Sequence, residues 1–129
     1  MYTFEVPIYY TNEYKTKKDK TILVGLNWYR NAHHRTSNIV KHYYHDIVAV
    51  LLRGKKFGKC RIHYKVFWKR RGTDPHNVRS IVEKFTLDGM VNCGALIDDS
   101  ADFILGTTTD WEQDKENPRM EITIEEIQE

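Results

Sequence analysis

The chain has 129 residues, of which 40% are hydrophobic and 29% charged, with a formal net charge of +2. These values are typical of one globular domain with its own core, so we expect a single domain over residues 1–129. The sequence has no run of about 18 apolar residues, no secretion signal and only two cysteines, Cys60 and Cys93. We therefore expect a cytoplasmic protein without membrane contact, disulfide framework or zinc ribbon, in which both thiols are reduced and buried.

Charge is distributed unevenly along the chain. Nine lysines and arginines and no acid lie between Ile47 and Thr73, whereas eleven acids and two bases lie from Asp98 onward. A basic block followed by an acidic segment favours a surface that binds a polyanion beside a carboxylate-rich patch. The alternative is an ordinary solvent-exposed surface, on which the charges lie together only because alternate residues of a strand point to the same face.

The first third of the chain predicts one strand and little other regular structure. Residues 2–10 alternate polar and apolar side chains and are rich in aromatics, as strands are. Residues 11–21 are rich in charge and indicate a loop. Residues 22–36 begin apolar and break at Gly25, which favours a strand end or connecting loop over a helix.

A helix is expected from Ser37, because apolar side chains recur at spacings of three and four as far as Leu51. Ser37 is a candidate N-cap and Gly54 a candidate stop. Residues 59–69 then alternate between basic side chains and these apolar or aromatic ones: Cys60, Ile62, Tyr64, Val66 and Trp68. That alternation predicts a strand with one buried face and one positive face.

A second helix is expected from about Val78 to Val91, followed by Gly94. Its apolar face combines four residues: Val78, Ile81, Val82 and Phe85. Two further alternating segments, residues 96–110 and 118–127, predict the last strands. The order strand, helix, strand, helix, strand, strand predicts an α+β domain with one mixed sheet and two main helices packed on it.

A polar stripe borders the apolar face of the second helix and consists of Asn77, Ser80, Lys84 and Asp88. At ~100° per residue these side chains fall within roughly 80° of one another, so they can face a groove while the helix packs on the sheet. Ordinary explanations remain open. Asn77 fits an N-cap, and Ser80 with Glu83 fits a capping box. Lys84 and Asp88 fit a surface ion pair.

Carboxylates near this helix suggest a metal site. Asp98 and Asp99 follow the helix after one short loop, and at least one of them could meet Asp74 across a site. Two or three converging carboxylates bind Mg²⁺ or Mn²⁺, which can position water and stabilise charge at a phosphate. A nearby lysine would stabilise the phosphate or the leaving oxygen. Beside a basic strand, this set predicts phosphodiester hydrolysis.

These residues resemble the RusA-type Holliday junction resolvases, a family frequent in phages and prophages. The matching residues are the stretch KRRGTDPHN at 69–77, then Lys84, Asp88, Gly94, Asp98 and Asp99. Asn27 and the order of elements also match. The chain departs from the family motif at two points. His76 replaces an acid of the motif, and Lys84 lies one helical turn farther from Asn77 than the corresponding lysine does in the best-known form of the family, a shift of ~6 Å along the helix axis.

The resemblance implies a homodimer that nicks opposed strands of a four-way DNA junction with Mg²⁺, or Mn²⁺, in phage recombination or repair inside a bacterial cell. Asp74 and Asp99 would be metal ligands, with Asp98 and His76 as auxiliary ligands, and Lys84 the catalytic lysine. Supporting residues around the ligands would be Asn77, Ser80 and Asp88. Residues expected to contact DNA phosphates are Arg61, Lys65, Lys69, Arg70 and Arg71.

The main alternative is a RusA-like protein that binds branched DNA without cutting it and has an architectural or regulatory role. His76 favours this alternative, because a neutral imidazole suits Mg²⁺ poorly and removes one negative charge from the site. A zinc site from His33, His34, His42 and His45 is a weaker possibility, since no cysteine or carboxylate set completes it. Three aromatic residues are expected in the core: Trp28, Tyr43 and Tyr44.

Overall fold

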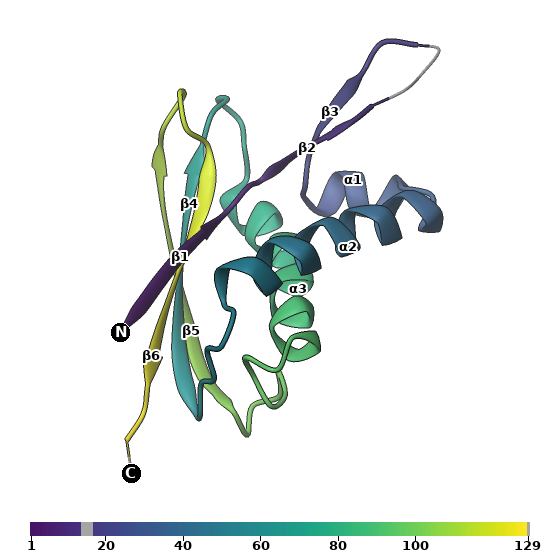
Figure 1. Ribbon diagram of the computed structural model, residues 1–129. Coiled ribbons are helices and arrows are strands. Elements are labelled where there is room, and N and C mark those ends of the chain that lie inside the picture. The colour runs from purple at the N-terminus through teal and green to yellow at the C-terminus, as the bar shows by residue number, and fades with distance from the viewer. Residues whose placement is uncertain (14–16, 129) are drawn as a thin grey trace.

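A mixed sheet of four strands organises the molecule, with the strand order β1-β6-β4-β5 (Figure 1). The computed structural model describes residues 1–13 and 17–128. The strands of this sheet are β1, Tyr2–Val6; β4, Cys60–Trp68; β5, Ile104–Gln113; and β6, Arg119–Glu126. β4 pairs antiparallel with β6 and parallel with β5, so the chain must cross over between β4 and β5.

Helix α3, Pro75–Asn92, makes that crossover and lies with α2, His34–Leu51, on one face of the sheet (Figure 1). The core fills the space between, where buried side chains of β1, β4 and β6 meet those of the two helices. The expected α+β fold, with two main helices on a mixed sheet, is confirmed. In the described residues, no helix has the length and apolar character needed to cross a membrane.

Helix α3 begins where a strong start signal meets an apolar face. The Oδ1 atom of Asp74, the N-cap, accepts hydrogen bonds from the backbone N–H groups of His76 at 3.0 Å and Asn77 at 3.3 Å. Pro75 takes the first helical position, where its missing N–H costs nothing. The expected start near Val78 with Asn77 as cap is therefore wrong. The expected apolar face is confirmed, because its four side chains are all buried: Val78, Ile81, Val82 and Phe85.

Strand β4 has the expected alternation over most of its length. The buried positions are Cys60, Ile62, Tyr64 and Val66. The prediction is wrong at Trp68, which is only half-buried, while its neighbour Phe67 is buried. Phe67 is covered because the guanidinium carbon of Arg119 lies 3.8 Å from the centre of its ring.

The chain before α2 departs most from expectation. Strands β2, Tyr9–Asn12, and β3, Lys20–Leu23, form an antiparallel hairpin with its own sheet, within and beside the expected loop over residues 11–21. Residues 14–16 of that loop lie outside the described residues. The strand end expected after residue 22 is confirmed, because β3 ends at Leu23. From Leu26 onward the expectation of a loop is wrong, because Leu26–Asn31 forms the short helix α1 and α2 begins soon after.

Helix α2 also begins earlier than its sequence indicates. The Nδ1 atom of His33, the N-cap, accepts a hydrogen bond from the backbone N–H of Arg35 at 3.1 Å. The expected cap at Ser37 is wrong, since Ser37 lies inside the helix and donates its hydroxyl to the carbonyl of His34 at 3.0 Å. Gly54 follows the end of the helix with φ of +75°, as expected of a stop.

Two of the three aromatic residues expected in the core are there. Tyr44 is fully buried and donates its hydroxyl to the carbonyl of Pro7, and this burial raises the pKa of the phenol. Trp28 is half-buried and packs on the core. The expectation is wrong for Tyr43, which is exposed and meets Tyr10 edge-on with ring centres 5.0 Å apart.

Both cysteines are free, but only Cys60 is buried. Burial raises the pKa of its thiol, with a smaller contribution from Glu126. Cys93 is exposed just beyond the end of α3, so the expectation of two buried thiols is half wrong.

Candidate functional site

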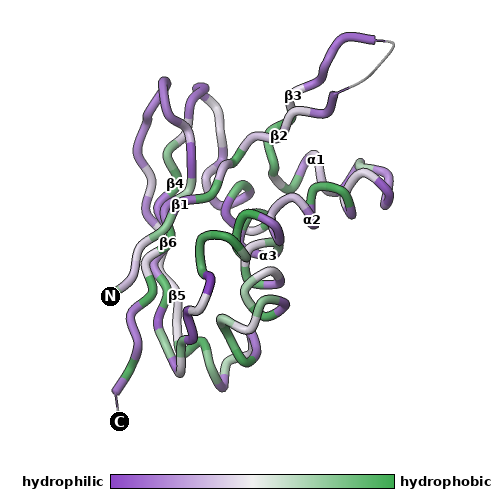
Figure 2. The backbone as a smooth tube through the Cα atoms, in the orientation of Figure 1, coloured by the Kyte–Doolittle hydropathy of each residue, from purple (hydrophilic) through white to green (hydrophobic). Residues whose placement is uncertain are grey.

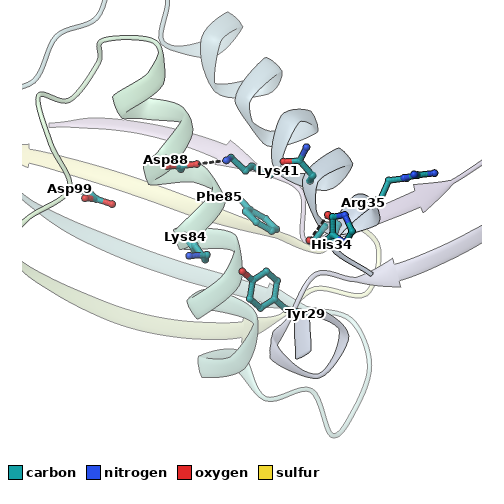
Figure 3. A pocket seen from close by; sticks show the side chains of 10 residues that line it. Tyr29, His34, Arg35, Lys41, Lys84, Phe85, Asp88 and Asp99 are labelled. Atoms are coloured by element: carbon teal, nitrogen blue, oxygen red, sulfur yellow. Dashed lines mark hydrogen bonds and ion pairs between the residues drawn. The ribbon is translucent and has the colours of Figure 1, made fainter. Parts of the chain in front are cut away.

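A groove of about 670 Å³ runs between α2 and α3 and collects much of the polar stripe expected on α3 (Figure 3). The residues that line it are Tyr29, His34, Arg35, Ser37, Asn38, Lys41, Lys84, Phe85, Asp88 and Asp99. Lys84 and Asp88 come from α3, and Asp99 comes from the loop that leads to β5. Three residues of the family-like motif, spread over sixteen positions of sequence, therefore line one groove.

The floor of the groove is aromatic. Phe85 is buried, and its ring meets that of Tyr29 in α1 edge-on, with centres 6.0 Å apart. The rings of Tyr44 and Trp28 also pack on Phe85, with ring centres 5.8 and 6.4 Å away. This packing fixes the helical turn that carries Lys84, because Lys84 and Phe85 are adjacent in sequence.

Asp88 joins the two walls of the groove. Its Oδ2 atom lies 3.5 Å from Nζ of Lys41 and 3.2 Å from Nε2 of His45, both in α2. The side chain of His45 is 11% exposed and that of Asp88 is 50% exposed, so this pair sits at the edge of the buried interface. Gly89 allows the close approach, since a Cβ there would lie 3.3 Å from Cα of His45.

Lys84 is exposed in the groove and pairs with no acid in the part of the chain that the structure describes. Asp99 is also exposed, and its backbone N–H donates to Oδ1 of its neighbour Asp98 at 2.9 Å. Asp98 does not line the groove. An unpaired ammonium and an accessible carboxylate that line the same groove can bind a phosphate oxygen and a water molecule.

Asp74 and His76 lie at the other end of α3. Asp74 precedes Lys84 by ten residues, which corresponds to about 15 Å along the helix axis. Its carboxylate caps the helix, and it does not line the groove. The exposed imidazole of His76 meets the ring of Trp111 in β5 edge-on, with centres 5.1 Å apart. The structure thus does not bring Asp74 and His76 together with Asp99.

The N-terminal half of the expected stripe also stays outside the groove. Asn77 lies in the first turn of α3, and Ser80 donates its hydroxyl to the carbonyl of Asn77 at 3.0 Å. A capping box of Ser80 and Glu83 is wrong, because both residues lie inside the helix. Glu83 instead pairs with Arg79 at 2.8 Å.

Arg79 fixes α3 on the sheet and has no counterpart in the sequence-based expectations. Its guanidinium donates to the hydroxyls of Thr109 and Thr107 in β5 at 2.6 and 2.7 Å. Its guanidinium carbon also lies 4.6 Å from the centre of the Tyr64 ring. Burial, and then the nearby Glu83 carboxylate, raises the pKa of Tyr64. This cluster sets the orientation of α3, and so of the groove.

In the described part of the chain, the side chains that could bind a metal ion do not gather into one group. Over residues 1–13 and 17–128, no group of three or more His, Cys, Asp or Glu side chains could hold a metal ion. A full protein cage for Mg²⁺ from Asp74, Asp98, Asp99 and His76 is therefore not formed. Mg²⁺ is often held by one or two carboxylates plus substrate phosphates. Asp88 and Asp99, which share the groove, fit that manner of binding.

The residues expected to track DNA phosphates differ in their surroundings. In register with β6, Arg61 lies opposite Glu125 and Lys65 lies opposite Glu121. Lys65 also pairs with Glu112 of β5 at 3.7 Å. The expected positive face of β4 is therefore wrong, because acids on both neighbouring strands interleave with its bases. The other three expected residues are exposed in the turn before α3: Lys69, Arg70 and Arg71.

The wall that α2 contributes was missing from the sequence-based site. Its polar members are His34, Arg35, Ser37, Asn38 and Lys41, in which His34, Asn38 and Lys41 recur at spacings of four and three. The same periodicity test that found the stripe on α3 would have found this one. The two polar stripes face each other where α2 packs on α3.

Comparison with known proteins adds no relative. No protein-family model matches the chain. A search of curated proteins finds no match either. Membership of the RusA-type family thus stays a prediction based on the motif residues between positions 69 and 99.

Proposed function

We propose that this protein is an endonuclease that cuts branched DNA, of the kind that resolves four-way junctions, and that the groove between α2 and α3 receives the strand to be cut. The convergence of Lys84, Asp88 and Asp99 in one groove carries this proposal. Lys84 and Asp88 belong to the polar stripe that the sequence predicts on this helix, and Asp99 belongs to the acidic pair that follows the helix. If Lys84 and Asp88 were only a surface ion pair, there would be no reason for Asp99 to line the same groove.

Charge in the groove supports a phosphodiester as the ligand. Lys41 on α2 points toward α3, which carries Lys84, so cations border the groove on both sides (Figure 3). Arg35 also lines the groove, although its side chain extends away from α3 (Figure 3). Arginine and lysine are the usual ligands of phosphate oxygens in protein–DNA complexes. Because Lys41 pairs with Asp88 and Lys84 with no acid in the described residues, Lys84 is the cation most available to a phosphate.

Hydrolysis assigns distinct tasks to Lys84 and Asp99. A water oxygen forms a bond to phosphorus while the bond between phosphorus and a deoxyribose oxygen breaks. Asp99 orients the attacking water and accepts its proton, and Lys84 stabilises the charge on the phosphate and on the leaving oxygen. Lys41 and His45 hold Asp88 in position at the groove wall.

A divalent cation fits this groove as a partner of the substrate. Asp88 and Asp99 would hold Mg²⁺, or Mn²⁺, with the DNA phosphate completing its coordination. When bound, the ion would neutralise phosphate charge and lower the pKa of the attacking water. In this proposal the protein acts as a homodimer, because a two-fold junction calls for two equivalent sites. It would act in the cytoplasm of a bacterium, as a phage or prophage product.

A second function, binding branched DNA without cutting it, is favoured by the position of Asp74. That carboxylate caps α3 and is about 15 Å from Lys84 along the helix axis. Among the residues that the structure describes, fewer acids therefore converge than the family motif implies. Such a protein would still bind DNA through the cationic groove but would not hydrolyse its phosphodiester bonds.

Nicking of a synthetic four-way junction distinguishes the two functions. The wild type is expected to nick the junction in Mg²⁺ or Mn²⁺ and to leave an unbranched duplex of the same sequence intact. Asp99→Asn is expected to bind the junction and to nick it at least about a hundredfold more slowly. Asp102→Asn, an exposed acid outside the groove, is the matched control. Tight binding by the wild type without nicking in either metal would support the non-cutting function.

A further inference from the structure

The β2–β3 hairpin extends away from the body of the protein and forms a sheet of its own (Figure 1). Its base is anchored, because Ile8 and Val24 are fully buried and the N–H of Val24 donates to the carbonyl of Ile8 at 2.8 Å. Its outer described residues, 11–13 and 17–21, are hydrophilic, whereas Ile22 and Leu23 pack against the core (Figure 2). A two-stranded hairpin without its own core contributes little to stability, so its extension into solvent calls for another explanation.

Among its described residues the hairpin carries two exposed acids, Glu13 and Asp19, against three exposed lysines, Lys17, Lys18 and Lys20. Lys18 and Lys20 are exposed, and neither pairs with an acid in the part of the chain that is described. A concave surface of about 540 Å³ lies at the base, where the hairpin meets α1 and the start of α2. Its lining contains no acid: Asn12, Lys20, Ile22, Leu23, Asn27, Trp28, Asn31, Ala32, His33 and Thr36.

This concave surface adjoins the groove between α2 and α3. The first turn of α2 separates the two hollows, with His33 and Thr36 lining the first and His34 and Arg35 lining the second. No acid occurs in the sequence between Asp19 and Asp46. The positive surface therefore continues from the hairpin, over the start of α2, into the groove.

We propose that the β2–β3 hairpin and the concave surface at its base bind the backbone of a duplex arm of the DNA substrate, beyond the point of cleavage. This inference rests on the proposed function. Duplex DNA fits because its phosphates form a regular line of negative charge that the acid-free concave surface, extended by Lys18 and Lys20, can follow. A two-stranded ribbon is also a shape that the major groove accommodates. The hairpin would then favour substrates with long arms over short branched ones.

The test compares Lys18→Ala/Lys20→Ala with the control Lys55→Ala/Lys56→Ala, which removes the same charge from an exposed loop on a different element. Binding is measured by fluorescence anisotropy over a range of salt concentrations. The probes are four-way junctions with arms of about 20 bp, two helical turns, or about 5 bp, half a turn. Nicking is measured in parallel, and thermal melting checks that each variant is folded.

On long arms the hairpin variant is expected to bind about tenfold more weakly than the wild type, with a slope of log K against log salt reduced by about 2. On short arms the two should bind equally, and the control should match the wild type on both. Equal binding of long arms by the hairpin variant, or an equal loss in the control, would overturn the inference. In that case nicking by the wild type would leave the proposed function standing. A wild type that neither binds nor nicks any junction would reject both.

Discussion

The Nε2 atom of His45 in α2 lies 3.2 Å from Oδ2 of Asp88 in α3, and this contact joins the two walls of the groove. It forms because Gly89, the residue after Asp88, lets the helices approach closely. The position of Asp88 in the candidate site thus depends on residue 89 being a glycine, which has no side chain. The geometry of the groove and the packing of the core are coupled at this point.

Gly89→Val tests that coupling. A Cβ at this position would lie 3.3 Å from two atoms of His45 and 3.4 Å from Cβ of Val48, and valine adds two further methyl groups. The variant is expected to lose about 1–3 kcal/mol of unfolding free energy, because α2 must move away from α3. Urea denaturation measures the loss. Gly58→Val is the control, since Gly58 has open space around it and should cost less than about 0.5 kcal/mol.

Substitutions of Asp74 separate helix capping from catalysis. Asparagine caps a helix about as well as aspartate, so Asp74→Asn is expected to keep its stability within a few tenths of a kcal/mol, whereas Asp74→Ala should lose about 1 kcal/mol. Urea denaturation and junction nicking are measured on both. If Asp74 is a metal ligand, as the family resemblance implies, Asp74→Asn will lose nicking while it stays folded. An unchanged nicking rate in Asp74→Asn would show that Asp74 only caps helix α3 and is not a metal ligand.

The turn between β5 and β6 carries a pH-dependent contribution to stability. The backbone N–H of Asn117 is the main cause that lowers the pKa of Asp114, helped by Arg119 and by the N–H of Glu116, although desolvation opposes them. A carboxyl with a lowered folded-state pKa stabilises the fold above its unfolded pKa, and this contribution disappears as the pH falls through the folded-state value.

Asp114→Asn is therefore expected to melt at a lower temperature than the wild type near neutral pH. The difference should shrink as the pH falls below about 3.9, the ordinary pKa of aspartate. Thermal melts followed by circular dichroism across this range measure it. Asp102→Asn should melt like the wild type throughout. A difference for Asp114→Asn that stays constant down to about pH 3 would contradict this assignment.

Much of the fold could be predicted because its core positions repeat with a clear period. Val78, Ile81 and Phe85 are all buried on the apolar face of α3, and β4 alternates because its two faces meet different surroundings. The start of α2 could not be predicted from a cap, because His33 is not a common N-cap residue whereas Ser37 is. The hairpin was missed because its strands are short and polar, and their pairing depends on partners that periodicity does not identify.

The candidate site was predicted in part for a similar reason. Lys84 and Asp88 share a helix face by their spacing alone. Asp74 was expected to meet Asp99, although Asp-Pro is a common helix start that places Asp74 at the far end of α3. The cations of α2 were not expected in the site, since nothing local in the sequence says that α2 packs against that face of α3.

Single-turnover nicking of a four-way junction by Lys84→Ala tests the central claim most directly. Protein is held in excess at saturating concentration, so the rate reports the reaction rather than binding, and anisotropy measures the affinity separately. Lys56→Ala, an exposed lysine outside the groove, is the control. The groove account predicts that Lys84→Ala binds the junction within about tenfold of the wild type but nicks it about 10²–10³ times more slowly. A Lys84→Ala protein that nicks at the wild-type rate would contradict it.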